Sequence, residues 1–565
     1  MEEADLVIIG AAKTYLQVHP HTNLVILEAA STLGGVWAQH RLHPGLKSNN
    51  MLGTYENSDF PMDEATFGIK TGEHIPGPVI HDYLAKYAER FDITPKIRFQ
   101  SRVTTVTKNS EDGGWVLSVE DSSPHASESK RLHAHKLVLA TGLVSEAFLP
   151  AHEGASSFDA PIFHSKDFLQ HAETLKTNGR VAILGSAKSA YDAAYAYASA
   201  GIPMDWIIRE SGHGPCWMAP PYVTPLKRWL EKLIFTRILT WMSPCIWGDA
   251  DGFGWIRRLL HGNAIGSALA NGFWWVLGND VVSLNGYDKH PETAKLKPWY
   301  APFWSGCNLS IINYPTDFWE LVRSGKVRVH VADITRLSAK TIHLSNGESL
   351  PVEALLCATG WRHKPTIKFV PDGLDAELGL PHHSDQPDKL MGKADAEVLS
   401  RLPRLRDQPV LNPNLKPLQE SKQTPTGHPN RPYLLYHFMV PPAFYKDRSI
   451  GFAGAAMTPA HAICLQIQSL WLTAYLDGNL PLDKSEDEVR WETMLHARFL
   501  RWRYPGGHGA QFPDFVFDSL PYFDLLLGEL GLRTRRKGGW VRELTEGYGP
   551  EDYRGLVEEW VGFEG

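Results

Sequence analysis

The stretch Val181-Ala-Ile-Leu184, followed by Gly185-Ser-Ala187-Lys-Ser-Ala190, decides the fold of this chain. A short apolar run, a turn of small residues and an alanine-rich helix form the strand–turn–helix unit that binds dinucleotide phosphates at the helix N-terminus. The three small positions of the turn are Gly185, Ala187 and Ala190. The hydroxyl groups of Ser186 and Ser189 can donate hydrogen bonds to a phosphate. The stretch therefore predicts an α/β protein with a parallel sheet.

The next apolar run indicates which nicotinamide cofactor this unit takes. Met204-Asp-Trp-Ile-Ile208 predicts the neighbouring strand, and Arg209 follows it directly. An NAD site carries an acid at this position, whereas a basic residue accommodates the 2′-phosphate of NADP. Arg209 therefore favours NADPH over NADH. The alternative is that Arg209 is a solvated surface charge.

A similar unit near the N-terminus is shortened. Leu6-Val-Ile-Ile9 and Asn23-Leu-Val-Ile-Leu-Glu28 predict two parallel strands, and Glu28 is placed to bind an adenosine ribose. A helix is predicted from residue 11 to residue 18. Only Gly10 remains of the three glycines that the phosphate-binding turn needs. Two such units in one chain suggest a flavin enzyme that also takes a nicotinamide cofactor, although Gly10 and Glu28 also fit an ordinary sheet edge.

Several motifs in the chain resemble those of the flavin-containing monooxygenases, fungal members above all. Glu28 followed by Gly34-Gly35-Val36-Trp37 is similar to the acid and GGxW motif that frames the adenine and pyrophosphate end of FAD in that family. The further motifs, in order, are Ser48-Asn49 with Ser58-Asp59-Phe60-Pro61, Leu139-Ala140-Thr141-Gly142, the signature from Phe158 to Phe168 with His164, Ala358-Thr359-Gly360-Trp361, and Gly451-Phe-Ala-Gly454 with Gln468. Single motifs are weak evidence, but this order over residues 5–475 is rarely accidental.

The resemblance implies a fold and a reaction. The fold is two Rossmann-like domains, an FAD domain with an inserted NADPH domain, followed by a helical C-terminal extension. In the reaction, NADPH reduces the flavin, and the reduced flavin reacts with O₂ to give a C4a-hydroperoxide. One oxygen atom then passes to a small, apolar metabolite, as in secondary-metabolite biosynthesis.

The resemblance also assigns roles to single residues. Asn49 is the expected catalytic residue, because an amide beside the flavin ring can hydrogen-bond the peroxide; the alternative is a turn asparagine in Asn49-Asn50. His164 is expected to be a hinge or cofactor-positioning residue at the domain junction. The full set of expected cofactor-binding residues is Gly10, Glu28, Gly34, Gly35, Trp37, Asn49, Thr141, Gly142, His164, Gly185, Ser186, Ala187, Ser189, Arg209, Thr359, Gly360 and Gln468.

Other functions stay open at this point. Phe168 ends the family signature where Baeyer–Villiger enzymes usually carry tryptophan, which favours heteroatom oxygenation over a Baeyer–Villiger or epoxidising reaction. The missing glycine-rich turn also allows a catalytically impaired pseudoenzyme, or a sequence error at an exon junction. A disulfide reductase is disfavoured, because the five cysteines are widely separated and form no CxxC pair.

The predicted domain layout follows the motifs. Residues 1–170 form the first part of the FAD domain, 175–325 the NADPH domain, 326–480 the returning part of the FAD domain, and 481–565 a helical extension. Strands within 326–357, with a turn at Asn346-Gly347, are predicted to return to the FAD domain. The Pro-, Asp- and Lys-rich stretch 382–432 is predicted to be an extended surface loop.

An aromatic-rich insert at 215–300 is longer than a dinucleotide-binding unit requires. Lys227–Met242 has apolar residues near helical spacing with basic residues between them, and Leu259–Leu277 has no Asp, Glu, Lys or Arg. A cap over the substrate channel, an interfacial membrane helix within 227–277 and a membrane span all remain possible, in decreasing order of preference.

The charge and the N-terminal sequence indicate the expected partners and location of the protein. The net charge is −7, with 56 basic and 63 acidic residues, so no basic surplus suggests a nucleic-acid partner. The N-terminus lacks the basic start and apolar run of a signal peptide, and a cytoplasmic location, with possible membrane association, is the expectation. The partners expected are a small-molecule substrate and O₂, and the oligomeric state is left open.

Overall fold

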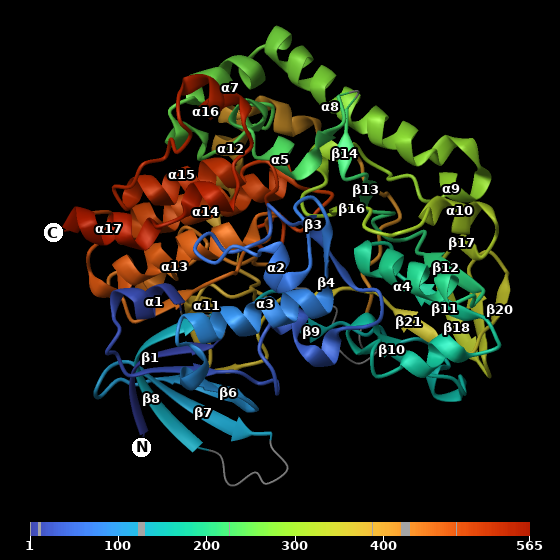
Figure 1. Ribbon diagram of the computed structural model, residues 1–565, viewed down its shortest axis with the longest axis horizontal. Helices are drawn as coiled ribbons and strands as arrows, with labels where there is room; N and C mark the ends of the chain where they lie inside the picture. The colour runs from blue at the N-terminus through green and yellow to red at the C-terminus, as the bar shows by residue number, and fades with distance from the viewer. Residues whose placement is uncertain are drawn as a thin grey trace.

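The computed structural model describes residues 2–9, 13–122, 130–224, 226–386, 388–419, 430–481 and 483–564. Gly10 and the shortened turn around it lie outside these residues. The described chain forms two main sheets with helices packed around them, and a helical region built by the C-terminal third covers the first sheet (Figure 1). The expected α/β fold with a helical C-terminal region is confirmed.

The first sheet is centred on the N-terminal strand. β1 (Glu2–Ile9) lies between β2 (Leu24–Leu27) and β8 (Lys130–Leu139) and is parallel to both. β2 is an apolar run buried throughout, and the end of β8, Leu137–Leu139, is buried as well, as parallel strands require. The remaining strands are β5 (Ile97–Arg98) beside β2, then β7 (Trp115–Asp121), β6 (Ser101–Lys108) and β23 (Lys368–Val370) beyond β8, and β24 (Ile450–Phe452) parallel to β8.

The second sheet contains the strand Val181–Leu184 and the small-residue turn that follows it. Its five parallel strands run in the order β10 (Ile162–His164), β21 (Leu355–Cys357), β11 (Val181–Leu184), β12 (Met204–Ile208) and β17 (Val327–Val331). Helix α4 (Lys188–Ser199) follows β11 and packs on β11 and β12 through its buried alanines and tyrosines. The predicted strand–turn–helix unit is therefore confirmed.

The prediction that residues 326–357 return to the first domain is wrong. β17 pairs with β12, and β21 lies between β10 and β11, so both strands belong to the second sheet. β10 also belongs to the second sheet, although the first domain was expected to extend to residue 170. An apolar run specifies a buried strand but not the sheet that it joins. The predicted turn at Asn346-Gly347 does connect an antiparallel pair, β19 (Thr341–Leu344) and β20 (Ser349–Pro351), beside β18 (Ile334–Ser338).

The chain passes between the two sheets twice, and the two crossings lie side by side. β9 (Glu146–Ala147) leaves the first sheet, β22 (Trp361–Arg362) leaves the second, and the two pair antiparallel. The β9–β22 pair comes just after the expected linker motif 139–142 and at the end of the expected linker motif 358–361. It therefore brings the two motifs together.

The aromatic-rich insert is less regular than its periodicity predicts. The segment 227–242 is broken into β15 (Arg228–Trp229), α5 (Leu230–Ile234) and α6 (Arg237–Thr240). It breaks because the buried Glu231 and Arg237 side chains contact partners in different parts of the protein. α7 (Gly254–Gly262) and α8 (Ala264–Asn285) follow, separated at Asn263, whose side chain caps α8. Within the described ranges, no helix combines the length and apolar character needed to cross a membrane.

The expected extended loop at 382–432 contains a helix. α12 (Lys389–Arg401) begins at the capping residue Asp388 and packs against α14 (Glu486–Arg503). Asp395 pairs with Arg498 at 2.7 Å, while Ala394 and Val398 are buried. The polar composition concealed this amphipathic pattern. The C-terminal region continues with α15 (Ser519–Glu529), α16 (Trp540–Thr545) and α17 (Leu556–Glu564), and it packs on α13 (His461–Asp477).

Candidate functional site

The carboxyl ends of four parallel strands meet at one edge of the first sheet. Ile9 pairs in register with Leu139, and Leu139 pairs with Phe452. The residues that follow these strands therefore lie along the same edge, namely Glu28 after β2, Thr141 and Gly142 after β8, and Gly454 after β24. Ligands of open parallel sheets bind outside this edge. The structure thus brings together the expected FAD-binding residues after β2 and β8.

Glu28 and the GGxW turn form one end of this edge. The Glu28 carboxylate accepts the Ala30 N–H at 2.8 Å, and burial raises the pKa of Glu28 against the lowering effect of nearby backbone N–H groups. Gly34 has φ +110°, and a Cβ there would lie 3.1 Å from the Trp37 carbonyl carbon. Gly35 is also left-handed, so the turn over Gly35–Trp37 depends on both glycines.

Asn49 lies on β3 (Lys47–Met51), which pairs with β4 (His74–Pro76). Its neighbours are fixed on both sides, since Ser48 Oγ accepts the Ile75 N–H at 3.0 Å and Asn50 donates to Glu231. The Asn49 Oδ1 atom is buried and has no hydrogen-bond partner within the described part of the chain, and the same holds for Ser58 Oγ. Buried polar atoms without a partner are rare in folded proteins, and these two fit the polar edge of a bound ring such as that of FAD.

Glu231 of α5 holds the Asn49 strand in place. Its carboxylate accepts hydrogen bonds from the Met51 N–H at 3.0 Å, Thr54 Oγ1 at 2.8 Å and Trp229 Nε1 at 3.0 Å, as well as from the Asn50 amide. Burial raises the pKa of Glu231, while these donors lower it. No motif marks this residue, and its only signal in the sequence is a lone acid in the mostly apolar run 229–235. Glu231 shows that the insert packs directly on β3.

The second sheet gathers the expected nicotinamide-binding residues in the same way. In register, His164 is level with Cys357, and Cys357 with Leu184. The segments that follow these strands are therefore neighbours: Ala358-Thr359-Gly360, Gly185 with Ser186 and Ala187, and Arg209. Gly185 has φ +143°, and a Cβ there would lie 2.3 Å from the Ala358 carbonyl oxygen. Only glycine allows the two linked segments to approach so closely.

The N-terminus of α4 is open for an anion. Ala187 is the capping residue and offers no side-chain hydrogen bond to the helix, and both Ala187 and Ser189 are exposed. The first N–H groups of a helix that lacks a side-chain cap attract phosphate. The expected phosphate-binding residues Gly185, Ser186, Ala187 and Ser189 therefore lie at this uncapped helix N-terminus.

His164 joins the end of β10 to the second crossing. Its Nδ1 accepts the Lys166 N–H at 3.0 Å, so Nε2 carries the proton and donates to the Gly360 carbonyl at 2.9 Å. Burial lowers the pKa of His164 to about 4, so the ring is neutral at neutral pH. Thr359 Oγ1 donates to the Phe148 carbonyl at 2.6 Å and ties the same turn to the first crossing. The His164 and Thr359 side chains therefore both hold the linker turn 358–360 in place.

Arg209 lies at the end of β12, as predicted, and is half-buried. Its Nη2 donates to the Lys416 carbonyl at 2.8 Å and to the Ser211 carbonyl at 3.3 Å. Asn412 donates to the Glu210 and Gly212 carbonyls, so the segment 412–416 covers the turn that follows β12. Arg209 is therefore held by two backbone carbonyl oxygens, and its contact with Lys416 is exposed.

Asn313 connects the two edges. Its Nδ2 donates to the carbonyls of Lys47 and Ser48 on β3, at 3.1 and 3.0 Å, and its Oδ1 accepts from Lys188 Nζ at 3.0 Å. Lys188 is the first residue of α4, next to the pyrophosphate position. A two-bond path thus links the nicotinamide unit to the strand that carries Asn49. Nothing in the sequence around residue 313 marked it as a site residue.

Comparison with known proteins identifies the family. A family model described as L-lysine 6-monooxygenase/L-ornithine 5-monooxygenase matches residues 66–216. The FAD-dependent monooxygenase resA of Aspergillus sclerotiorum is 32% identical over 99% of this chain and 98% of that protein. The FAD-dependent monooxygenase DEP4 of Alternaria brassicicola is 31% identical over 99% of this chain and 95% of that protein. The chain belongs to the FAD-dependent monooxygenases.

Solved structures support the fold. Cyclohexanone-bound cyclohexanone monooxygenase superimposes with a TM-score of 0.59 at 15% identity and covers 94% of this chain and 98% of its own. The NADP⁺-bound enzyme of Rhodococcus sp. Phi1 gives 0.57 at 16% identity, with 94% and 98% covered. The membership inferred from the motifs is thus confirmed, as are the FAD cofactor and the monooxygenase reaction, which takes a small-molecule substrate and O₂.

Gln468 in this FAD-dependent monooxygenase is fully engaged with the protein. Its Oε1 accepts the Gly454 N–H at 3.1 Å, and its Nε2 donates to Tyr522 Oη at 2.9 Å. Tyr522 Oη in turn donates to the His437 carbonyl at 2.7 Å. Gln468 therefore fixes the turn after β24, and its two polar groups are occupied by protein partners.

Residues distant in sequence meet around Asp59 in the monooxygenase. The Gly555 N–H donates to Asp59 Oδ1 at 2.9 Å, and Gln466 Nε2 donates to Asp59 Oδ2 at 3.1 Å. Lys13, at the start of α1 (Lys13–Val18), forms an ion pair with the same carboxylate. Asp59, which belongs to the motif Ser58-Asp59-Phe60-Pro61, thus joins three separate segments.

A cavity of the monooxygenase lies between the insert and the segment 403–407. It has a volume of about 840 Å³ and is lined by α8, the segment 297–304 and residues from 403 to 407. Aromatic side chains form much of its wall, including Trp217, Trp274 and Tyr300. Trp217 begins β13 (Trp217–Ala219), which pairs with β16 (Leu309–Ile311), and Asn313 follows β16 closely. One wall of the cavity is therefore linked, through the β13–β16 pair, to Asn313, whose side chain contacts β3.

Proposed function

We propose that this monooxygenase uses NADPH and O₂ to place one oxygen atom on a small, apolar metabolite, as a step in secondary-metabolite biosynthesis. The observation that carries the proposal is the buried, unpartnered Asn49 Oδ1 on a strand that Asn313 ties to the open N-terminus of α4. This geometry supports a nicotinamide and a flavin held against each other. The fungal relatives and the NADP⁺ bound in the Rhodococcus enzyme agree with it.

The chain's own residues would bind the nucleotides and set their approach. The N-terminus of α4 would take the pyrophosphate of NADPH, and Arg209 its 2′-phosphate. Glu28 and the turn over Gly34–Trp37 would hold the adenosine end of FAD. FAD, when bound, supplies the acceptance of hydride and the activation of O₂. The Lys188–Asn313 link would keep the two binding units in one relative position during hydride transfer.

Asn49 would orient the oxygen-activating part of the site, and the insert would keep it dry. The Asn49 amide can donate and accept hydrogen bonds without adding charge. Glu231 fastens the insert to β3, so that the aromatic segment covers the strand instead of exposing it to water. Water exclusion protects reactive oxygen species from unproductive decay. The cap is the function that we propose for 215–300.

The cavity indicates the substrate class. A space of about 840 Å³ with tryptophan and tyrosine walls suits a flat, apolar molecule of metabolite size. We favour oxygenation of a nitrogen or sulfur atom, because Phe168 replaces the tryptophan usual in Baeyer–Villiger enzymes. Product analysis with candidate metabolites separates this reaction from epoxidation and from lactone formation.

The direct test of the proposal is flavin binding and NADPH consumption. The purified protein should show flavin absorption bands and oxidise NADPH with uptake of O₂. A protein that stays colourless with added FAD would support the impaired-enzyme alternative. A glycine-rich insert after Gly10 should then restore the colour and the NADPH oxidation, and its failure to do so would show that the shortened turn is not the cause.

Asn49→Ala should separate NADPH consumption from product formation. We expect product per NADPH to fall about a hundredfold, the order seen when one positioned polar group is removed from an active site, with a matching rise in H₂O₂. Product and H₂O₂ are measured together at equal NADPH turnover. Asn109→Ala, in the turn between β6 and β7, is the control and should keep the wild-type ratio. Unchanged coupling in Asn49→Ala would contradict the role of Asn49.

Arg209→Ser should change cofactor selectivity. Loss of one charged hydrogen-bond donor corresponds to roughly a 10- to 150-fold rise in the KM for NADPH, with little change for NADH. Steady-state kinetics with both cofactors measure the effect. Arg336→Ser, an exposed arginine on β18, is the matched control. An equal loss with both cofactors would show instead that Arg209 serves only to hold the segment 412–416.

A further inference from the structure

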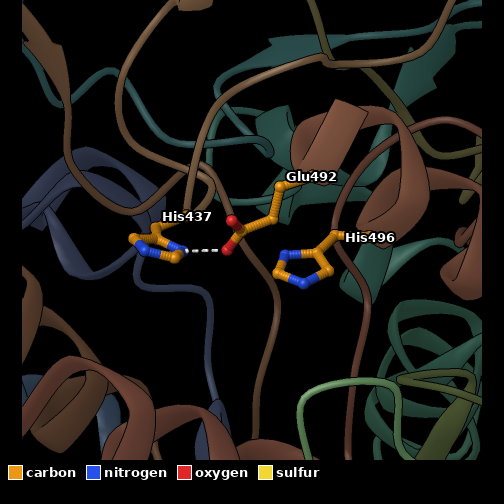
Figure 2. A group of neighbouring side chains, drawn as sticks. All are labelled: His437, Glu492 and His496. Atoms are coloured by element: carbon orange, nitrogen blue, oxygen red, sulfur yellow. Dashed lines mark ion pairs between the residues drawn. The ribbon is translucent and has the colours of Figure 1, made fainter. Parts of the chain in front are cut away.

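We propose that His437, Glu492 and His496 form a binding site for a divalent transition-metal ion, with the ligand set of a zinc site. The three side chains each present one ligand atom, and these atoms lie within 4.8 Å of one another. Figure 2 shows the Glu492 carboxylate between the two imidazole rings. Two histidines and one carboxylate are a set that zinc uses in proteins.

The spacing between His437 and Glu492 fits an ion better than a hydrogen bond. His437 Nδ1 is 4.0 Å from Glu492 Oε1, which is too long for a hydrogen bond. Two ligands at about 2.0–2.1 Å from a tetrahedral Zn²⁺ lie roughly 3.3–3.4 Å apart, so the two atoms would approach by about half an ångström on binding the ion. His437 is about 1% exposed, and its Nδ1 has no hydrogen-bond partner among the described residues. A buried nitrogen aimed at a carboxylate across this gap is what a metal would satisfy.

The second nitrogen of His437 is already oriented as in a metal site. Its Nε2–H donates to Glu529 Oε1 at 2.8 Å, and Glu529 Oε2 accepts the Trp471 Nε1–H at 2.8 Å. A carboxylate on the far nitrogen fixes the tautomer of a metal-binding histidine and raises its basicity. The lone pair of Nδ1 is thereby directed toward Glu492 and His496.

The other two ligands share one face of α14. Glu492 and His496 are four residues apart, which places them on adjacent turns of the helix. His496 is buried, with the ring of Trp247 packed edge-on at 5.3 Å between centroids. His437 lies in the tight turn Tyr436–Val440, whose ends exchange backbone hydrogen bonds. The metal would therefore join the segment leading into β24 to the C-terminal helical region.

Charged side chains surround the three proposed ligands. Lys484 pairs with Glu492, and Glu529 adds a second carboxylate next to His437. Without a metal, the same geometry leaves His437 Nδ1 unpaired, 4.0 Å from Glu492, while its Nε2 contacts Glu529. With a metal, the three protein ligands leave a fourth position for water. The two arrangements differ in metal content, which can be measured without any reference to the flavin.

The experiment uses full-length protein purified without a histidine tag. We expect about one Zn²⁺ per chain by elemental analysis, removal by a chelator with a fall in Tm of several degrees, and recovery of the Tm with Zn²⁺ alone. Both the FAD-loaded and the FAD-free protein are measured. Absence of bound metal together with a Tm that does not respond to Zn²⁺ would overturn the proposal and leave the ion network around His437.

Variants identify the ligands. Glu492→Gln and His496→Gln should abolish Zn²⁺ retention, whereas Glu486→Gln, at the exposed start of the same helix, should keep it. Glu529→Gln preserves the three ligands and should weaken Zn²⁺ binding about 10- to 100-fold, which a residue with a purely structural role would not do. If the ligand variants fail to fold, Co²⁺ substitution of the wild-type protein decides. Visible bands of a tetrahedral Co²⁺ site support the proposal, and their absence overturns it.

Discussion

Gly185→Ala is expected to lower the rate of flavin reduction by NADPH more than a hundredfold. The new Cβ would lie 2.3 Å from the Ala358 carbonyl oxygen, and the backbone at φ +143° disfavours any L side chain. The turn must therefore shift, and its N–H groups move away from the pyrophosphate. A displacement of about 1 Å at a positioning element can cost a hundredfold in rate.

The measurement is rapid-mixing reduction of bound flavin by NADPH, with FAD content and Tm recorded on the same sample. Gly201→Ala is the matched control, because Gly201 also has a positive φ but a Cβ there would have no atom within 4 Å of it. We expect the control to reduce its flavin at the wild-type rate. Normal reduction in Gly185→Ala would refute the assignment of this turn to NADPH.

Arg237→Leu is expected to destabilise the protein by about 3–5 kcal/mol, the usual result of leaving buried charges without their partner. Arg237 is fully buried and pairs with Asp524 at 2.6 Å and with Glu543 at 2.6 Å. Tyr548 Oη lies 3.2 Å from the same guanidinium. The variant removes the one cation that all three contact.

Chemical denaturation followed by tryptophan fluorescence measures this loss. Arg258→Leu is the control, because its pair with Asp249 at 2.9 Å is exposed and worth about 0–1 kcal/mol. Adding Asp524→Asn and Glu543→Gln to Arg237→Leu should recover part of the stability, since the uncompensated charges are then removed. Equal stability of Arg237→Leu and the wild type would show that the network contributes nothing.

Local motifs predicted where the nucleotide sites begin. An apolar run followed by a small-residue turn or by an acid marks the end of a parallel strand, so Gly185, Glu28, Thr141 and Arg209 lie at the strand ends where the motifs predicted them. Parallel strand ends converge at one edge by geometry, so that the grouping of these residues follows from the strands alone. The order of the motifs then led to the family.

Contacts between distant segments could not be predicted in this way. Asn313 and Glu231 act on β3 from far along the chain, and neither lies in a motif. The sheet that β17 and β21 join depends on the register of packed strands, whereas periodicity reports only that they are buried. The helix α12 was missed because composition outweighed its spacing of apolar residues.

The contact of Gly555 with Asp59 constrains the order in which the enzyme is assembled. The two residues are 496 positions apart, and Arg554 reaches the Ser58 carbonyl across the same distance in sequence. Domains fold from the N-terminus while the ribosome is still adding residues. The first sheet is complete only once β24 (Ile450–Phe452) has been made, and its Asp59 corner remains open until residue 555 has emerged. Closure of this corner of the enzyme is thus an event of late synthesis or of the period after release.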